Sequence, residues 1–149
     1  MDHRGKRSES RLKLFITKDR EQHRSEFIAS IIINLIIWYI ANNIVNWNLS
    51  FISPIFTEVL GILNLLLIST ILINFIFIFY HPGWFRNMLR IVIDILGIIT
   101  AYTFLTVFPF ILNQTLAFGL TILIILGIIG GIIGMIIHIL KFLYGASNK

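Results

Sequence analysis

The sequence predicts an all-α integral membrane protein, an up-down bundle of four transmembrane helices with both termini in the cytoplasm. Two observations support this fold class. Hydrophobic residues make up 57% of the 149-residue chain and charged residues 13%, whereas a soluble domain has roughly 45–50% and about 25%. The apolar residues also gather in four long runs. A soluble domain of this length could not bury so much apolar surface, so the composition indicates a membrane protein.

The four apolar runs define the predicted helices. Each has about 20 or more residues, enough to cross a hydrocarbon core of roughly 30 Å at about 1.5 Å per residue. Because lipid offers the backbone no hydrogen bonds, helices are the structure that satisfies such long runs. The transmembrane domain is expected over residues 27–144, with helices over about 27–46, 54–80, 89–112 and 116–144.

Polar or helix-breaking residues lie between the runs. Ser53 and Pro54 suit the N-cap and the first position of the second helix. The stretch His81-Pro82-Gly83 is expected to end that helix, because proline and glycine both discourage its continuation. The stretch Asn113-Gln114-Thr115 is the polar part of a tight turn before the fourth helix.

The basic residues predict the orientation. All 12 Lys and Arg residues fall on one side of the predicted bundle. They are Arg4, Lys6, Arg7, Arg11, Lys13, Lys18, Arg20 and Arg24 in the tail, Arg86 and Arg90 around the second turn, and Lys141 and Lys149 at the C-terminal end. The positive-inside rule makes that side cytoplasmic. The high content of Ile, Asn and Lys is typical of AT-rich microbial genomes, so we expect a multi-pass protein of a microbial cytoplasmic membrane.

The N-terminal tail, residues 1–26, is expected to be cytoplasmic, as is the short tail 145–149. A short interfacial helix near Arg11 and Lys13 would lie on anionic lipids of the inner leaflet; a solvated tail is the alternative. Arg86 and Arg90 are also expected at the membrane surface. Acidic side chains interleave with the basic ones in the tail, which argues against nucleic acid as a partner.

The fourth helix carries closely spaced glycines, two pairs of which are four residues apart. Such pairs lie on one helix face and let another backbone approach closely. Two interpretations are open: a seam between two copies of the chain or with another membrane protein, or packing against the third helix near Gly97 and Ala101. The candidate packing residues are Gly127, Gly130, Gly131 and Gly134.

Asp94 and Glu58 are the acids within the apolar segments. Intramembrane charges are costly and often functional. Arg90 precedes Asp94 by four residues, so an ion pair on one helix face is the structural alternative. Glu58 is near the outer start of its helix, where the helix dipole favours a carboxylate and where it could simply be solvated.

Amide side chains are more numerous than a passive anchor requires, and a histidine lies near the inner end of the fourth helix. These groups could line a polar path or hydrogen-bond between helices. The arrangement favours hydrogen bonding, because the two amides of the second helix fall on different sides of it. These candidates are Asn34, Asn64, Asn74 and His138.

The sequence predicts no catalytic, metal-binding or cofactor-binding residues. The chain has no cysteine, and no nucleophile–base pair, phosphate-binding loop or metal-ligand spacing is present. We therefore expect a non-enzymatic membrane subunit or scaffold that acts through helix–helix association. The alternative is an oligomeric channel or small-solute transporter that uses Asp94, Glu58 and the buried amides.

Overall fold

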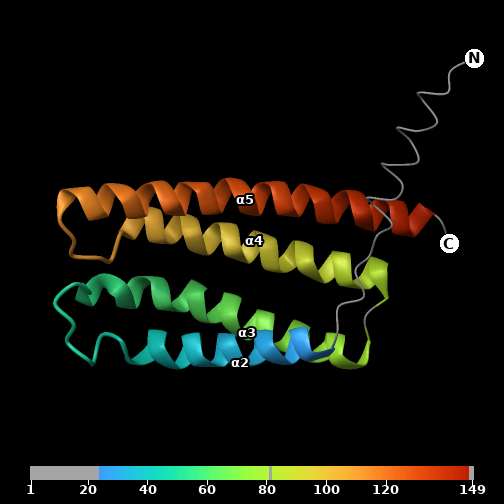
Figure 1. Ribbon diagram of the computed structural model, residues 1–149, viewed down its shortest axis with the longest axis horizontal. Coiled ribbons are helices and arrows are strands. Elements are labelled where there is room, and N and C mark those ends of the chain that lie inside the picture. Colours follow the sequence, from blue (N-terminus) through green and yellow to red (C-terminus); the bar gives the residue numbers. More distant parts are fainter. Residues whose placement is uncertain (1–23, 81, 148–149) are drawn as a thin grey trace, which may run out of the picture.

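The computed structural model describes residues 24–80 and 82–147 (Figure 1). This part of the chain contains four helices that are long and apolar enough to cross a membrane, as predicted. The elements in chain order are α2 (Arg24–Asn43), the 3₁₀-helix η1 (Pro54–Phe56), α3 (Thr57–Phe79), α4 (Gly83–Val107) and α5 (Gln114–Ser147).

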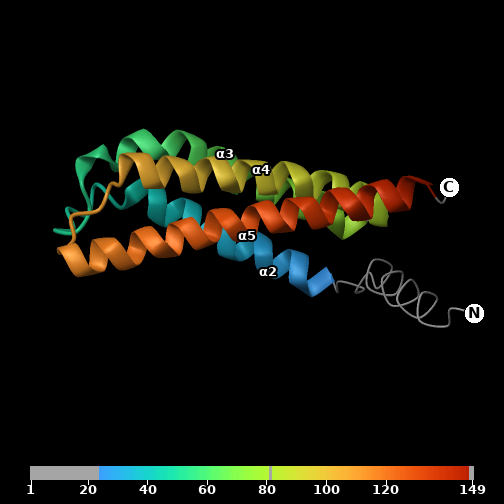
Figure 2. The same cartoon turned by 90° about the horizontal axis from the view of Figure 1, so that it is seen from above.

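The helices lie side by side in chain order, each antiparallel to the next (Figure 1). The extensive contacts are between neighbours in the sequence: α2 with α3, α3 with α4, and α4 with α5. Among the described residues, α2 and α5 share no extensive contact, and the two cross in the view from above (Figure 2). The bundle is therefore a pair of helical hairpins joined through α3 and α4, and its two outer helices are not packed together.

The helix bounds differ most from expectation in α4, which we predicted over 89–112. It begins at Gly83, because the polar residues that precede the apolar run are compatible with a helix. It ends at Val107, where Phe108 takes a left-handed conformation with φ of 40° directly before Pro109. A residue that precedes proline is disfavoured in the α region, so the apolar run continues beyond the helix.

The connections at one end of the bundle are tied to each other. The Ser53 side chain accepts a hydrogen bond from the Ile55 amide and Pro54 begins η1, so the predicted cap is confirmed. The amide of Ser53 donates to the carbonyl of Pro109 at 3.0 Å, and the amide of Ile111 donates to that of Phe51 at 2.9 Å. These backbone bonds join the α2–α3 connection to the α4–α5 connection.

Two apolar clusters fill the ends of the bundle. The cluster at the connection end contains Ala41, Ile52, Phe56 and Val59. The cluster at the opposite end contains Phe27, Ile73 and Phe77, and the rings of Phe27 and Phe77 lie 5.5 Å apart. Both clusters join α2 to α3, and partly buried residues of α4 pack against each.

A pair of amides links α2 and α3. The Asn42 Nδ2 donates to the Asn64 Oδ1 at 2.8 Å, and the Asn64 Nδ2 donates to the Asn42 Oδ1 at 3.0 Å. Each amide therefore satisfies a donor and an acceptor of the other. This interhelical bonding is the role that the sequence favoured for Asn64.

Two of the four closely spaced glycines of α5 face α4, and the other two have open space beside them. A Cβ added at Gly131 would lie 3.0 Å from the Ile98 side chain, and one added at Gly134 would lie 4.0 Å from the Asp94 carboxylate. Gly131 and Gly134 thus face α4, which was one of the two interpretations left open, although their neighbours are Ile98 and Asp94 rather than Gly97 and Ala101. Added Cβ atoms at Gly127 and Gly130 have no described neighbour within 4 Å.

The amide pair predicts a stability effect. Asn42→Ala removes one partner and leaves the Asn64 amide unpaired, so we expect a loss of about 1 kcal/mol in the free energy of unfolding. The measurement is reversible unfolding in detergent, followed by circular dichroism. Asn43→Ala is the matched control, because Asn43 donates to Tyr39 of its own helix. Equal losses in the two variants would contradict a special role for the pair.

Candidate functional site

Asp94 and His138 meet between α4 and α5. The Nδ1 of His138 lies 2.6 Å from the Oδ2 of Asp94, although 44 positions separate them in the sequence. Their side chains are partly exposed, at 20% for Asp94 and 19% for His138. The contact exists because Gly131 and Gly134 bring α5 close to this part of α4. Asp94 lies about three turns after the start of α4, because the helix begins at Gly83 and not near residue 89 as predicted.

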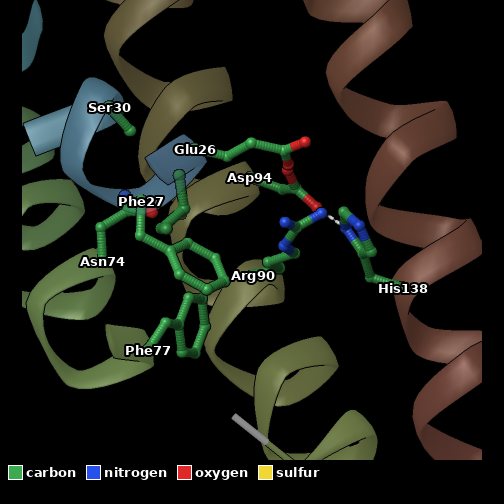
Figure 3. A pocket seen from close by; sticks show the side chains of 9 residues that line it. Glu26, Phe27, Ser30, Asn74, Phe77, Arg90, Asp94 and His138 are labelled. Atoms are coloured by element: carbon green, nitrogen blue, oxygen red, sulfur yellow. Dashed lines mark hydrogen bonds and ion pairs between the residues drawn. The ribbon is translucent and has the colours of Figure 1, made fainter. Parts of the chain in front are cut away.

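The pair faces a pocket of about 280 Å³ that all four helices line. Figure 3 shows the side chains of Glu26, Arg90 and Asp94 converging on the same space, with His138 beside Asp94. The polar lining residues are Glu26 and Ser30 from α2, Asn74 from α3, Arg90 and Asp94 from α4, and His138 from α5. The pocket therefore offers both signs of charge together with neutral hydrogen-bonding groups.

Aromatic side chains form the apolar wall of the pocket. Phe27 and Phe77 line it together with Ile93, and both phenylalanines are 1% exposed. These rings belong to the apolar cluster at this end of the bundle, so tertiary packing fixes the wall. A partly apolar cavity with a few convergent polar groups is the usual form of a small-ligand site, and the volume of this one lies just below the usual range of roughly 300–1,000 Å³.

The lining groups suit the binding of a polar ligand. The carboxylate of Asp94 fixes the orientation of the His138 imidazole between two helices. Arg90 has a guanidinium with several N–H donors, which suits carboxylate or phosphate groups. Within residues 24–80 and 82–147, no group of three or more His, Cys, Asp or Glu side chains could hold a metal ion.

The structure brings some of the predicted polar residues together and separates others. Asp94, His138 and Asn74 line the pocket. The Asn74 amide donates to the Thr70 carbonyl, a bond within its own helix. Asn34 likewise donates to the carbonyl of Ser30 at 2.7 Å. Asn34 makes this local bond away from the pocket, whereas Asn74 makes its local bond and also lines the pocket.

Glu58 and Asn64 lie elsewhere. Glu58 is exposed in the first turn of α3, at the end of the bundle where the two connections meet. Asn64 is paired with Asn42. The acids that the alternative hypothesis combined, Glu58 and Asp94, therefore do not share a site in the described structure.

The predicted surface cations differ in their positions. Arg86 is 6% exposed, so its side chain is buried in the folded chain and not spread on an outer surface as expected. Arg86 lies in the first turn of α4, ahead of residue 89, where the helix was predicted to begin. Arg90 is partly buried and lines the pocket. Arg11 and Lys13, with the predicted interfacial helix, lie outside the described residues.

Glu26 and Ser30 were not predicted as site residues. Both belong to the first turns of α2, where Glu26 looked like the last charge of a solvated tail. The pairing of Asp94 with His138 was not predicted, although the sequence contains a signal for it. The two residues lie at similar distances along the chain from the turn at residues 113–115, so an antiparallel hairpin brings them to similar depths.

Comparisons of the chain with protein-family models, with curated proteins and with solved structures found no match. The function must therefore be argued from the residues and geometry of this chain.

Proposed function

We propose that the chain is a multi-pass protein of a microbial cytoplasmic membrane, with both termini in the cytoplasm. We further propose that it is a non-enzymatic subunit or scaffold that acts through helix–helix association. The observation that carries this proposal is the exposed apolar surface of α5. This helix is the longest described helix, its most apolar stretch has a mean hydropathy of 2.9, and none of that stretch is buried inside the chain. Lipid and a partner helix are the surroundings that suit such a surface.

The distribution of charge supports the orientation. The connections at residues 44–56 and 108–113 lie together at one end of the bundle and contain no Lys or Arg. Arg24, Arg86, Arg90 and Lys141 lie toward the opposite end. Under the positive-inside rule the connection end is outside and the opposite end is cytoplasmic.

Site-directed labelling tests this orientation. The chain has no cysteine, so Ser50→Cys and Lys149→Cys each introduce a single thiol. A membrane-impermeant maleimide should label Ser50→Cys in intact cells and should label Lys149→Cys after permeabilisation. The reverse pattern would contradict the proposed orientation, and labelling of both thiols in unbroken cells would contradict the even number of spans.

The open glycines support association. Gly130 has an exposed backbone, and no described atom lies within 4 Å of an added Cβ, so a second helix can approach there without displacing a side chain of this chain. Small residues on an exposed face are what membrane helices use for close packing. A second copy is the simplest partner, because a two-fold pair uses the same patch twice.

Gly130→Leu tests the association. The new side chain holds the partner backbones apart, so we expect self-association in detergent or bilayers to weaken by about tenfold, which corresponds to about 1.4 kcal/mol. Förster transfer between labelled copies is the measurement. Gly61→Leu is the matched control, since Gly61 of α3 is also exposed and open. Unchanged transfer in Gly130→Leu would mean that this face does not join two copies.

The polar pocket favours a second candidate, a channel or small-solute transporter. Its charged groups lie in a pocket that all four helices line, and Asp94 is central to them (Figure 3). This candidate predicts ion or solute flux in liposomes that contain the purified protein. We expect Asp94→Asn to abolish the flux, because it removes the charge that faces His138, and Glu58→Gln at the other end to preserve it. Absence of flux above empty liposomes would exclude this candidate.

A further inference from the structure

Two hollows follow one another along the same face of the α4–α5 hairpin. The first is the polar pocket around Arg90, Asp94 and His138. The second is a groove of about 320 Å³ between α4 and α5, lined on α4 by Gly97, Ala101 and Phe104 and on α5 by Leu120, Ile124 and Gly127. Steps of three, four or seven residues connect the α4 positions, so these side chains share one helix face. The polar pocket is therefore followed along this face by the apolar groove.

The groove offers almost no hydrogen bonds. Thr100 lies in its wall, but its hydroxyl donates to the Leu96 carbonyl at 2.7 Å and is thereby satisfied within α4. An added Cβ at Gly97 or Gly127 meets no described atom within 4 Å, so the glycines leave the groove open. Its occupant must be apolar, because a buried polar group would find no partner there.

The spacing of the two hollows fits a lipid. Gly97 is seven residues beyond Arg90, which is about 10 Å along a helix axis. One leaflet contributes about half of a hydrocarbon core of roughly 30 Å. A chain that begins at the depth of Arg90 therefore reaches past Gly97 and into the groove. A small soluble ligand would fill the pocket and leave the groove unused.

We propose that this face binds one phospholipid with a zwitterionic headgroup that carries a primary ammonium. Its phosphate lies against Arg90, its ammonium lies between the carboxylates of Glu26 and Asp94, and one acyl chain follows the α4–α5 groove. The pocket is not a simple cation or anion site, because acidic and basic side chains converge in it (Figure 3). A guanidinium carries five N–H donors, so Arg90 can serve the phosphate together with other acceptors.

The charges select among headgroups. An anionic headgroup without an amine would satisfy Arg90 but would bring negative charge to Glu26 and Asp94. A quaternary ammonium has no N–H to donate to these carboxylates, whereas a primary ammonium has three. Charge-assisted hydrogen bonds are about twice as strong as neutral ones. Phosphatidylethanolamine is therefore favoured over phosphatidylglycerol and phosphatidylcholine.

Native mass spectrometry of the full chain in detergent tests the proposal with these three lipids as probes. We expect one phosphatidylethanolamine per chain, bound at least about tenfold more tightly than phosphatidylglycerol, a ratio that corresponds to about 1.4 kcal/mol. Asp94→Asn should reduce this preference. Gly97→Leu adds a side chain to the open groove, where the new Cβ meets no described atom within 4 Å, and it should weaken binding by a similar factor. Gly61→Leu, the control, should bind as the unaltered chain does.

Several results would overturn the proposal. Equal affinity for phosphatidylglycerol would show that the pocket does not select the headgroup. Unaltered lipid binding by a folded Gly97→Leu variant would show that the acyl chain does not occupy the groove. Soluble phosphoethanolamine that binds as tightly as the lipid would make the ligand a solute. A dimer that dissociates in Gly97→Leu would make a second copy the occupant.

The lipid proposal rests on the membrane insertion proposed above, but the tests are separate. Failure of insertion appears in the maleimide labelling of Ser50→Cys and Lys149→Cys in cells. Failure of self-association appears in the transfer measurement on Gly130→Leu, a position outside both hollows. A chain that inserts but shows no headgroup preference would contradict the lipid proposal alone.

Discussion

The close approach of α4 and α5 across Gly131 is the contact on which the functional features of the chain depend. Because Gly131 has no side chain, Ile98 can pack directly against the backbone of α5. That approach brings the carboxylate of Asp94 within 2.6 Å of the imidazole of His138. The same approach forms the walls of the apolar groove. A larger residue at Gly131 would separate the helices and alter both features together.

Several amide and hydroxyl side chains of the bundle form hydrogen bonds within their own helix or with one partner on the next helix. Asn34, Asn74 and Thr100 bond to carbonyls of their own helices, and Asn42 and Asn64 satisfy each other. In a low-dielectric surrounding an unpaired amide would be costly. Three charged groups, Glu26, Arg90 and Asp94, instead line one pocket to which all four helices contribute. That contrast separates structural polar residues from candidates for binding.

Much of the fold could be predicted from the sequence. The four apolar runs became four helices, and Ser53 and Pro54 mark the start of the second one as expected. These features depend on local composition and on residues that are adjacent in the chain. The bounds of α4 were wrong because an apolar run and a helix end for different reasons: Pro109 stops the helix, whereas the run continues.

The site was harder to predict, because it depends on contacts between distant residues. Asp94 was recognised, but the residue beside it is His138 on another helix. Gly131 and Gly130 look alike in the sequence, yet one faces α4 and the other is open. Glu26 belongs to the pocket only because the first turn of α2 lies at the same depth in the bundle as Arg90 of α4. Periodicity assigns a residue to a face of its helix, but it does not say which neighbour that face meets.

The backbone bridge between Ile52 and Phe110 has a mechanical consequence. It fastens the two hairpins together where their connections lie, and the short link between α3 and α4 fastens them at the other end. The outer helices are held differently, since α2 enters the bundle and α5 leaves it at the pocket end (Figure 1). At the pocket end each outer helix is therefore held by side-chain contacts and not by a chain connection: Phe27 of α2 packs against Phe77, and His138 of α5 contacts Asp94. The width of the space between Glu26 and His138 thus depends on side-chain packing alone.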